Sequence, residues 1–343
     1  MSYNQNSGYG AALLNRLNAV AASVCPTFGR ILVVMSPSDT ADPNYQTLEE
    51  VCKVDPDGNV RFFTTLSAAY DAATTNNNDV ILMDAHSAHV IASQIAWSKS
   101  RIHVVGMEGS GRYTEQGTRI QGTVGAATAA LIKVTGMRNT FRNIKFIQND
   151  TNAAAINVII AAGSSTLYQD CSFIFEVTDN LDLTTCCEVL IAEAGGTFKR
   201  CVFGNDSILS SAVRFVTEFN AVTGAAGGTY GGKHNTFIDC MWTIMSSSAD
   251  AHFLKITKGQ FRNTLINPVF HAVVNGTNSA VTLTAAIESA TGFTDGNLLV
   301  VNPAANTTDL CTTATSVTVV GHSMADSADN NVAITVGIAQ TPA

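Results

Sequence analysis

The segment Asp84-Ala85-His86-Ser87-Ala88-His89 brings one carboxylate and two imidazoles together, and these groups can bind a metal ion. Zinc-binding histidine pairs of this kind normally stand at i and i+4 on a helix. Here His86 and His89 stand at i and i+3, directly after a strand that we predict over 79–83. We therefore favour histidines that close or cap a turn, and we predict no metal site.

Scattered carboxylates are the second group with catalytic potential. Cleavage of a polysaccharide in a surface groove needs two acids about 5–10 Å apart whose pKa values differ. The carboxylates in question are Glu176, Asp179, Asp182, Glu188, Glu193, Asp206 and Glu218. They form no dense cluster along the sequence, although stacked repeats can bring distant residues into contact. We predict no catalytic residues and a protein that is not an enzyme.

Motifs for nucleotide or covalent chemistry are absent from the sequence. Neither GxSxG nor GxxxxGK[ST] occurs. The glycines of Gly106–Gly111 are spaced as in a phosphate-binding loop, but no helix is predicted after them, so we interpret them as a turn. The eight cysteines contain no CxxC pair, which zinc sites usually show. We expect reduced, buried thiols and no cofactor.

An internal repeat indicates which elements position these residues. Five segments of seven residues align without gaps, and their aromatic residues stand at positions 141, 168, 198, 237 and 261. The segments are Thr140–Phe146, Leu167–Phe173, Thr197–Phe203, Thr236–Trp242 and Gln260–Ile266. Repeats of about 20–50 residues are typical of solenoids, propellers and arrays. These intervals are too short for the four strands of a propeller blade, so we predict a parallel β-helix. The longest interval holds an insertion over Asn220–Lys233.

Coils stacked in register place equivalent positions about 4.8 Å apart, so each repeated position becomes a row. We predict three rows that face inward and one polar row on the surface. The aromatic row is Phe141, Tyr168, Phe198, Phe237 and Phe261. The other inward rows are Ile144, Cys171, Cys201, Cys240 and Thr264, and Phe146, Phe173, Phe203, Trp242 and Ile266. The polar row is Asn143, Asp170, Arg200, Asp239 and Asn263. Exposed ion pairs stabilise little, so this row contributes about 1 kcal/mol in total.

Composition excludes several classes of protein. The chain has 343 residues and a formal net charge of −8, and 13% of its residues are charged, against about 25% in a typical soluble domain. No apolar run approaches the roughly 20 residues that span a bilayer. The negative balance disfavours neutralisation of nucleic-acid phosphates. We therefore expect neither a membrane nor a nucleic acid as partner, and the start of the chain shows no secretory signal pattern.

Residues on either side of the repeats complete the expected architecture. Amphipathic spacing predicts a helix over 10–24 and a second one over 66–73, with Thr64 or Thr65 as its N-cap. Before the repeats, short strands are predicted over 29–35, 60–63, 79–83, 90–92, 102–106, 119–123 and 131–135. After them, Thr-, Ala- and Val-rich strands are predicted over 280–284, 297–301, 316–320 and 332–337, as the final coils or as an oligomerising cap.

The order of a strand over 29–35, Asp55-Pro56-Asp57-Gly58, a helix, a strand over 79–83 and Ile102-His103-Val104-Val105-Gly106 resembles the N-terminal part of pectate-lyase-like β-helix proteins of tailed bacteriophages. The resemblance covers residues 29–275. It implies an all-β fold, a right-handed parallel β-helix solenoid with an N-terminal helical cap and a C-terminal β-rich segment. The calcium-binding acidic cluster and the catalytic arginine of that superfamily's enzymes have no match here.

The resemblance also implies a virion protein. We expect an N-terminal docking arm with an amphipathic helix over 1–28, a capped β-helix over 29–275, and a C-terminal oligomerisation or capping segment over 276–343. The function that follows is that of a homotrimeric capsid decoration or cement protein, made in the host bacterial cytoplasm, which binds the major capsid protein on the capsid surface. The alternative is a tailspike or receptor-binding protein that binds or depolymerises a host glycan. Such a protein would show a groove with two close carboxylates or an aromatic platform.

Overall fold

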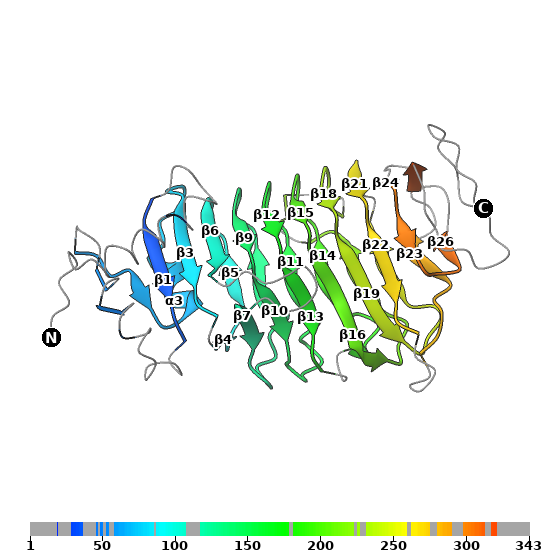
Figure 1. Ribbon diagram of the computed structural model, residues 1–343, viewed down its shortest axis with the longest axis horizontal. Coiled ribbons are helices and arrows are strands. Elements are labelled where there is room, and N and C mark those ends of the chain that lie inside the picture. Colours follow the sequence, from blue (N-terminus) through cyan, green and yellow to red (C-terminus); the bar gives the residue numbers. More distant parts are fainter. Residues whose placement is uncertain are drawn as a thin grey trace.

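The computed structural model shows strands stacked side by side along one long axis, with the N-terminal coils at one end and the C-terminal coils at the other (Figure 1). Every pairing between its strands is parallel, which makes the fold the predicted right-handed parallel β-helix. The structure describes residues 19, 29–36, 46, 49–50, 53–54, 58–85, 87–107, 117–177, 181–222, 225–226, 231–258, 262–274, 280–289, 298–312 and 317–320. Within these ranges no helix is both long and apolar enough to cross a bilayer.

Three sheets form the walls of the solenoid. Sheet 1 contains, in spatial order, β2 (Phe62–Phe63), β1 (Ile31–Val34), β3 (Asp79–Met83), β6 (Ile102–Gly106), β9 (Thr140–Arg142), β12 (Leu167–Gln169), β15 (Thr197–Lys199), β18 (Thr236–Ile238), β21 (Asn263–Ile266), β24 (Leu298–Val301) and β27 (Val317–Val320). Sheet 2 contains β4 (Ala88–Ile91), β7 (Arg119–Gly122), β10 (Lys145–Gln148), β13 (Ser172–Phe175), β16 (Val202–Ser210), β19 (Met241–Ser246), β22 (Val269–Ala272) and β25 (Ala304–Ala305). Sheet 3 contains β5 (Ile95–Trp97), β8 (Ile132–Val134), β11 (Asn157–Ala161), β14 (Cys187–Ile191), β17 (Phe215–Phe219), β20 (His252–Ile256), β23 (Ala285–Ser289) and β26 (Asp309–Cys311).

The helix α3 (Leu66–Ala72) packs against β1, β2 and β3 at the N-terminal end. Its N-cap is Thr65, whose Oγ1 accepts the Ala68 N–H at 3.2 Å, and this choice between the two predicted caps is settled by the geometry. Tyr70 of the helix is buried and its ring stacks on Trp97, with the ring centroids 4.1 Å apart. The helix therefore joins the core of the first complete coils.

The predicted aromatic row is confirmed over four coils. Phe141, Tyr168, Phe198 and Phe237 are register partners in sheet 1, and their rings lie nearly parallel at centroid distances of 5.5, 4.5 and 4.6 Å. All four are buried. Each ring therefore packs on the equivalent ring of the next coil, and offset stacking of this kind contributes about 0.5–1.5 kcal/mol per pair beyond area burial.

The two other inward rows are also confirmed over these coils. Phe146, Phe173, Phe203 and Trp242 stack at 5.2, 5.3 and 4.8 Å. Between them and the first row lie the buried thiols of Cys171, Cys201 and Cys240, whose Sγ atoms each contact a backbone carbonyl of the preceding coil at 3.4 Å. Burial raises the pKa of the Cys201 and Cys240 thiols well above their ordinary value. The six cysteines in the described ranges are free and buried, as predicted.

The fifth repeat was aligned four residues too early. Register pairs Phe237 with Leu265 and Trp242 with Phe270, so Leu265 and Phe270 take the positions assigned to Phe261 and Ile266. Phe261 lies outside the described residues. The pattern of an aromatic residue followed by a polar one favoured Phe261-Arg262-Asn263, but a leucine fills the same interior space. Thr264, expected inside, instead pairs with Thr236 on the outward row of sheet 1.

The polar row lies at the corner that follows sheet 1, and its members adopt left-handed backbone conformations. Asn143, Asp170, Arg200 and Asp239 have φ between +51° and +57°, and Asn267, rather than the predicted Asn263, continues the row at +50°. Arg200 donates to both carboxylate oxygens of Asp170 at 2.6 Å. Asn267 donates to Asp239 Oδ1 at 3.0 Å. The repeated turn thus selects residues that tolerate positive φ and can bond along the row.

The described strands beyond residue 280 continue the same three sheets. β23 pairs with β20, β24 with β21, and β27 with β24, all in parallel. The strand predicted over 280–284 begins five residues later, at Ala285. The predicted helix over 10–24 and strand over 332–337 lie outside the described residues, apart from residue 19. The division into an N-terminal arm over 1–28, a capped β-helix over 29–275 and a C-terminal segment over 276–343 stays a prediction.

Buried ionisable groups occur at several places along the solenoid, and three of them lie on the coils of β14 and β17. Arg214 and Glu188 are both buried and form an ion pair. Glu193, on the turn after β14, is fully buried, and burial raises the pKa of its carboxyl to about 8. Glu193 therefore holds its proton at neutral pH in the folded chain, whereas in the unfolded chain it ionises near its ordinary pKa.

Truncation of one stacked ring tests the assignment of inward and outward positions. We expect Phe198→Ala to lower the free energy of unfolding by about 3–5 kcal/mol, because it leaves a cavity in the aromatic row. Lys199→Ala removes the adjacent outward side chain and should change stability by less than about 0.5 kcal/mol. Denaturant unfolding of both variants checks this, and equal losses would contradict the assignment.

Replacement of the buried carboxyl tests its protonation. The folded pKa of Glu193 lies above the unfolded value, so its contribution to stability is intact below pH 4.5 and is lost as the pH rises towards 8. Glu193→Gln cannot ionise. We expect its stability relative to the native chain to increase between pH 5 and pH 9, by an amount on the order of 4 kcal/mol. Unfolding curves of both proteins measured across this range check the prediction; a constant difference would refute it.

Candidate functional site

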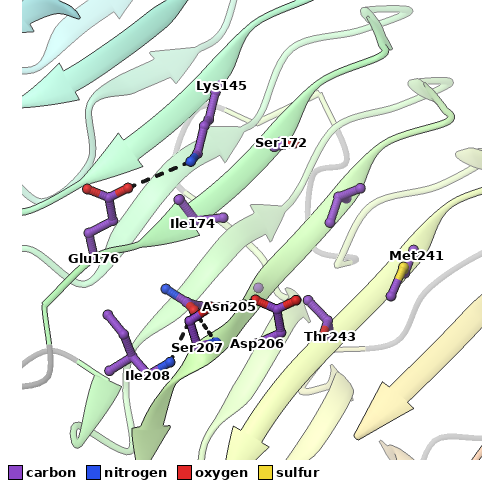
Figure 2. A pocket seen from close by; sticks show the side chains of 12 residues that line it. Lys145, Ser172, Ile174, Glu176, Asn205, Asp206, Ser207, Ile208, Met241 and Thr243 are labelled. Carbon is purple, nitrogen blue, oxygen red and sulfur yellow. Dashed lines mark hydrogen bonds and ion pairs between the residues drawn. The ribbon is translucent and has the colours of Figure 1, made fainter. Parts of the chain in front are cut away.

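A groove lies on the outer face of sheet 2, over β10, β13, β16 and β19 (Figure 2). Its volume is about 610 Å³. The residues that line it are Lys145, Ser172, Ile174, Glu176, Val202, Gly204, Asn205, Asp206, Ser207, Ile208, Met241 and Thr243. The set contains both polar and apolar side chains, so the groove can offer both hydrogen bonds and apolar contacts to a ligand.

The groove opens where β16 leaves β13. Ser172 and Phe173 pair with Val202 and Phe203, but the ladder between these strands ends there. The side chain of Asn205 spans the gap, because its Nδ2 donates to the Phe175 carbonyl at 2.8 Å. This replaces a lost ladder bond and keeps the two strands at a fixed separation.

A bulge in β16 builds one wall of the groove. β16 and β19 are in register from Val202 to Asn205 and again at Leu209, and the three residues between have no partner. Asn205 Oδ1 holds this bulge by accepting the N–H groups of Ser207 and Ile208 at 2.7 and 3.2 Å. Asp206 is consequently exposed beside the groove, with Oδ1 accepting the Ser207 hydroxyl at 2.8 Å.

Glycine is required at the start of the bulge. Gly204 has φ of +94°, and a Cβ there would lie 2.0 Å from the Thr243 carbonyl oxygen and 3.1 Å from Val216. The close approach of two backbones in neighbouring coils therefore depends on the missing side chain.

Charged groups occur on both sides of the groove. Lys145 on β10 and Glu176 after β13 approach to 3.8 Å, and the side chains are 19% and 39% exposed. A long ion pair that faces water contributes little stability, so both groups are free to exchange their partner for a ligand. With Asp206, the groove holds two carboxylates and one ammonium.

The structure separates the seven carboxylates that the sequence singled out. Glu176 and Asp206 come together at the groove. Glu188 and Glu193 are buried, and Glu218 accepts hydrogen bonds from Thr257 and Asn220 on the outside of sheet 3. Asp182 accepts the Ser211 N–H at 2.6 Å, and Asp179 lies outside the described residues.

Sequence reasoning missed the groove because it depends on a bulge. The signal was the run Gly204-Asn205-Asp206-Ser207, which has turn composition in the middle of a strand. Lys145 carried no signal, since its role follows only from its place in sheet 2.

His89, at the start of β4, closes the turn after β3, as predicted for this residue. His89 Nε2 lies 2.9 Å from Asp84 Oδ1 and 3.0 Å from the Asp84 carbonyl oxygen, and both residues are buried. His86 lies outside the described residues. In the part of the chain that the structure covers, no three His, Cys, Asp or Glu side chains gather in a way that could hold a metal ion.

Comparison with known proteins places the fold. Neither a protein-family model nor a curated protein sequence matches the chain. The chain is similar to the pectate lyase Pel9A, with a TM-score of 0.53 and 12% identity over 89% of this chain and 72% of that one. It is similar to a pectin methylesterase mutant in complex with a hexasaccharide, with a TM-score of 0.52 and 11% identity over 87% and 91%. ORF18 of Geobacillus virus E2 matches with a TM-score of 0.40 and 11% identity over 94% and 66%.

These similarities correct one expectation from the sequence. We expected a protein that is not an enzyme, but the solved structures that share its pectate-lyase-like β-helix include a pectate lyase and a pectin methylesterase. The scattering of carboxylates along the sequence was a poor guide, because the coils bring Glu176 and Asp206 to one groove from positions 30 residues apart. The fold itself is shared with enzymes that act on polysaccharides.

A small substitution tests whether the close approach of β16 to β19 requires glycine at position 204. Gly204→Ala places a Cβ against the backbone of β19 in a left-handed conformation, so we expect a loss of about 1–3 kcal/mol in the free energy of unfolding. Gly58→Ala is the matched control, because Gly58 also has positive φ, of +82°, but has no atom within 4 Å of the added Cβ. Thermal unfolding measures both variants. Equal losses of stability in Gly204→Ala and Gly58→Ala would mean that the positive φ alone, rather than the contact with Thr243, causes the destabilisation.

Proposed function

We propose that this chain binds a polysaccharide along the groove on sheet 2. The observation that carries the proposal is the combination, on sheet 2 and its bulge, of two carboxylates, a lysine, an asparagine and three hydroxyl groups with the apolar side chains of Ile174, Ile208 and Met241. Hydroxyl-rich ligands with apolar ring faces need both kinds of contact. The parallel sheet holds these groups without a folding step, which reduces the entropy lost on binding.

The charges of the groove favour a neutral saccharide or one that carries amino groups. Glu176 and Asp206 together outweigh the single ammonium of Lys145, and the whole chain carries a net charge of −8. A polyuronate would bring further negative charge to this surface. The ligand we propose therefore differs from pectin.

We also propose that the two carboxylates take part in the hydrolysis of a glycosidic bond. In that reaction one carboxylic acid protonates the leaving oxygen while a carboxylate activates the attacking water or attacks the sugar itself. Glu176 and Asp206 are the residues we assign to this step. Binding and cleavage are separated by the experiment below.

The biological setting we propose comes from the sequence resemblance to phage β-helix proteins. A polysaccharide groove favours a tailspike or receptor-binding protein over a capsid decoration protein. A homotrimer, contact with the major capsid protein and a place in the virion remain proposals. Mass spectrometry of purified particles separates the two settings, because a tail protein is present in few copies and a decoration protein in many.

The test uses the full chain with a surface polysaccharide purified from host bacteria, with dextran as a neutral polymer and with polygalacturonate. We expect isothermal titration calorimetry to show binding to the host polysaccharide or to dextran. Lys145→Gln and Asp206→Asn should each weaken this binding about tenfold, the loss typical of one charge-assisted hydrogen bond. Asp309→Asn removes the same charge from an exposed site on sheet 3 and should leave affinity unchanged.

Release of reducing ends in the same mixtures measures cleavage. Steady release that Glu176→Gln and Asp206→Asn abolish would establish hydrolysis at the groove. Binding without release would establish a receptor-binding protein. Equal affinity of the native chain, Lys145→Gln and Asp206→Asn for every polymer would overturn the proposal.

A further inference from the structure

A second depression lies at the turns that lead into sheet 1, near the N-terminal end of the solenoid. Its volume is about 260 Å³, and it is lined by residues of four successive turns, before β3, β6, β9 and β12. They are Asn76, Ser100, Arg101, Met137, Arg138, Ser164 and Ser165. The groove described above lies on sheet 2, so the two sites occupy different sides of the coil.

Two arginines occupy equivalent positions in this depression. The Arg101 N–H donates to the Met137 carbonyl at 2.9 Å, and the Arg138 N–H donates to the Ser164 carbonyl at 2.8 Å. Their φ values of +57° and +56° are nearly the same. Consecutive coils stand about 4.8 Å apart, so two positive side chains start one coil apart.

Neither guanidinium has an anionic partner among the described residues. The ion pairs of the described chain involve other cations, and no carboxylate lines the depression. Arg101 is half-buried and Arg138 is exposed. In a chain of net charge −8, two adjacent and unpaired arginines concentrate positive charge that no described side chain balances.

Neutral donors surround the two arginines. Ser100 Oγ accepts the Met137 N–H at 2.9 Å, which leaves its hydroxyl hydrogen free to donate. Ser165 and Asn76 add a further hydroxyl and an amide, both exposed. Met137, whose surface is 55% exposed, supplies an apolar contact beside them.

We propose that this depression binds an oxyanion, namely a carboxylate, sulfate or phosphate group. The planar guanidinium groups match the geometry of such groups with paired hydrogen bonds, and the hydroxyls of Ser100 and Ser165 complete the shell. The Met137 side chain packs on the apolar part of a ligand that carries the anion. This site is independent of the function proposed for the groove, because it shares no residue with it.

In the experiment, the full chain is titrated separately with inorganic phosphate, inorganic sulfate and a galacturonate oligosaccharide at low ionic strength, and calorimetry measures the binding. We expect Arg101→Gln and Arg138→Gln each to weaken binding about tenfold. Glutamine keeps an unbranched side chain at these left-handed positions, so the backbone is disturbed little. Arg119→Gln removes the same charge from an exposed site on β7 of sheet 2 and is the matched control.

The outcomes separate the sources of the anion. Binding of inorganic phosphate or sulfate identifies a free oxyanion, and binding of the oligosaccharide alone identifies an acidic saccharide; either supports the site when the two arginine variants lose it. No binding of any probe by the native chain, or equal weakening by Arg119→Gln, would overturn the proposal. Asp206→Asn should leave anion binding unchanged, which keeps this result distinct from the test of the groove.

Discussion

In-register hydrogen bonding between parallel coils is the constraint on which the other features of this protein depend. Once Tyr168 pairs with Phe198 and Phe198 with Phe237, every equivalent position is repeated at the same place in the next coil. Rings then stack on rings and thiols lie above thiols in the interior. The same repetition places left-handed residues in one corner row, so interior packing and surface pattern have one cause.

A departure from this register creates the groove on sheet 2, whereas the depression near Arg101 and Arg138 follows the register. The bulge after Asn205 is such a departure, and it opens the groove on sheet 2. The insertion between β17 and β18 is another: its Val222 and Ala225 pack on an apolar patch of Ile160 and Ala162 outside sheet 3.

Burial of an ionisable group in a folded protein costs free energy, and this protein offsets that cost in two ways. Glu188 and Arg214 are buried together, and a buried pair of this kind adds little net stability although loss of one partner is expensive. Glu193 avoids this cost by remaining protonated at neutral pH. Glu188 lies on β14, Glu193 on the turn after it, and Arg214 directly before β17 of the next coil.

The sequence by itself determined the repeat, and with it the parallel β-helix, the inward rows over four coils, the helix after Thr65 and the buried cysteines, whereas the structure decided between Thr64 and Thr65 as its N-cap. These follow from side chains that recur at fixed offsets, and recurrence can be read without coordinates. The fifth repeat was misplaced because leucine can replace an aromatic ring at Leu265. Only the tertiary structure decided which surface residues meet. Glu176 and Asp206, or Arg101 and Arg138, become neighbours because the length of each coil sets the register, and no local pattern in the sequence encodes that length.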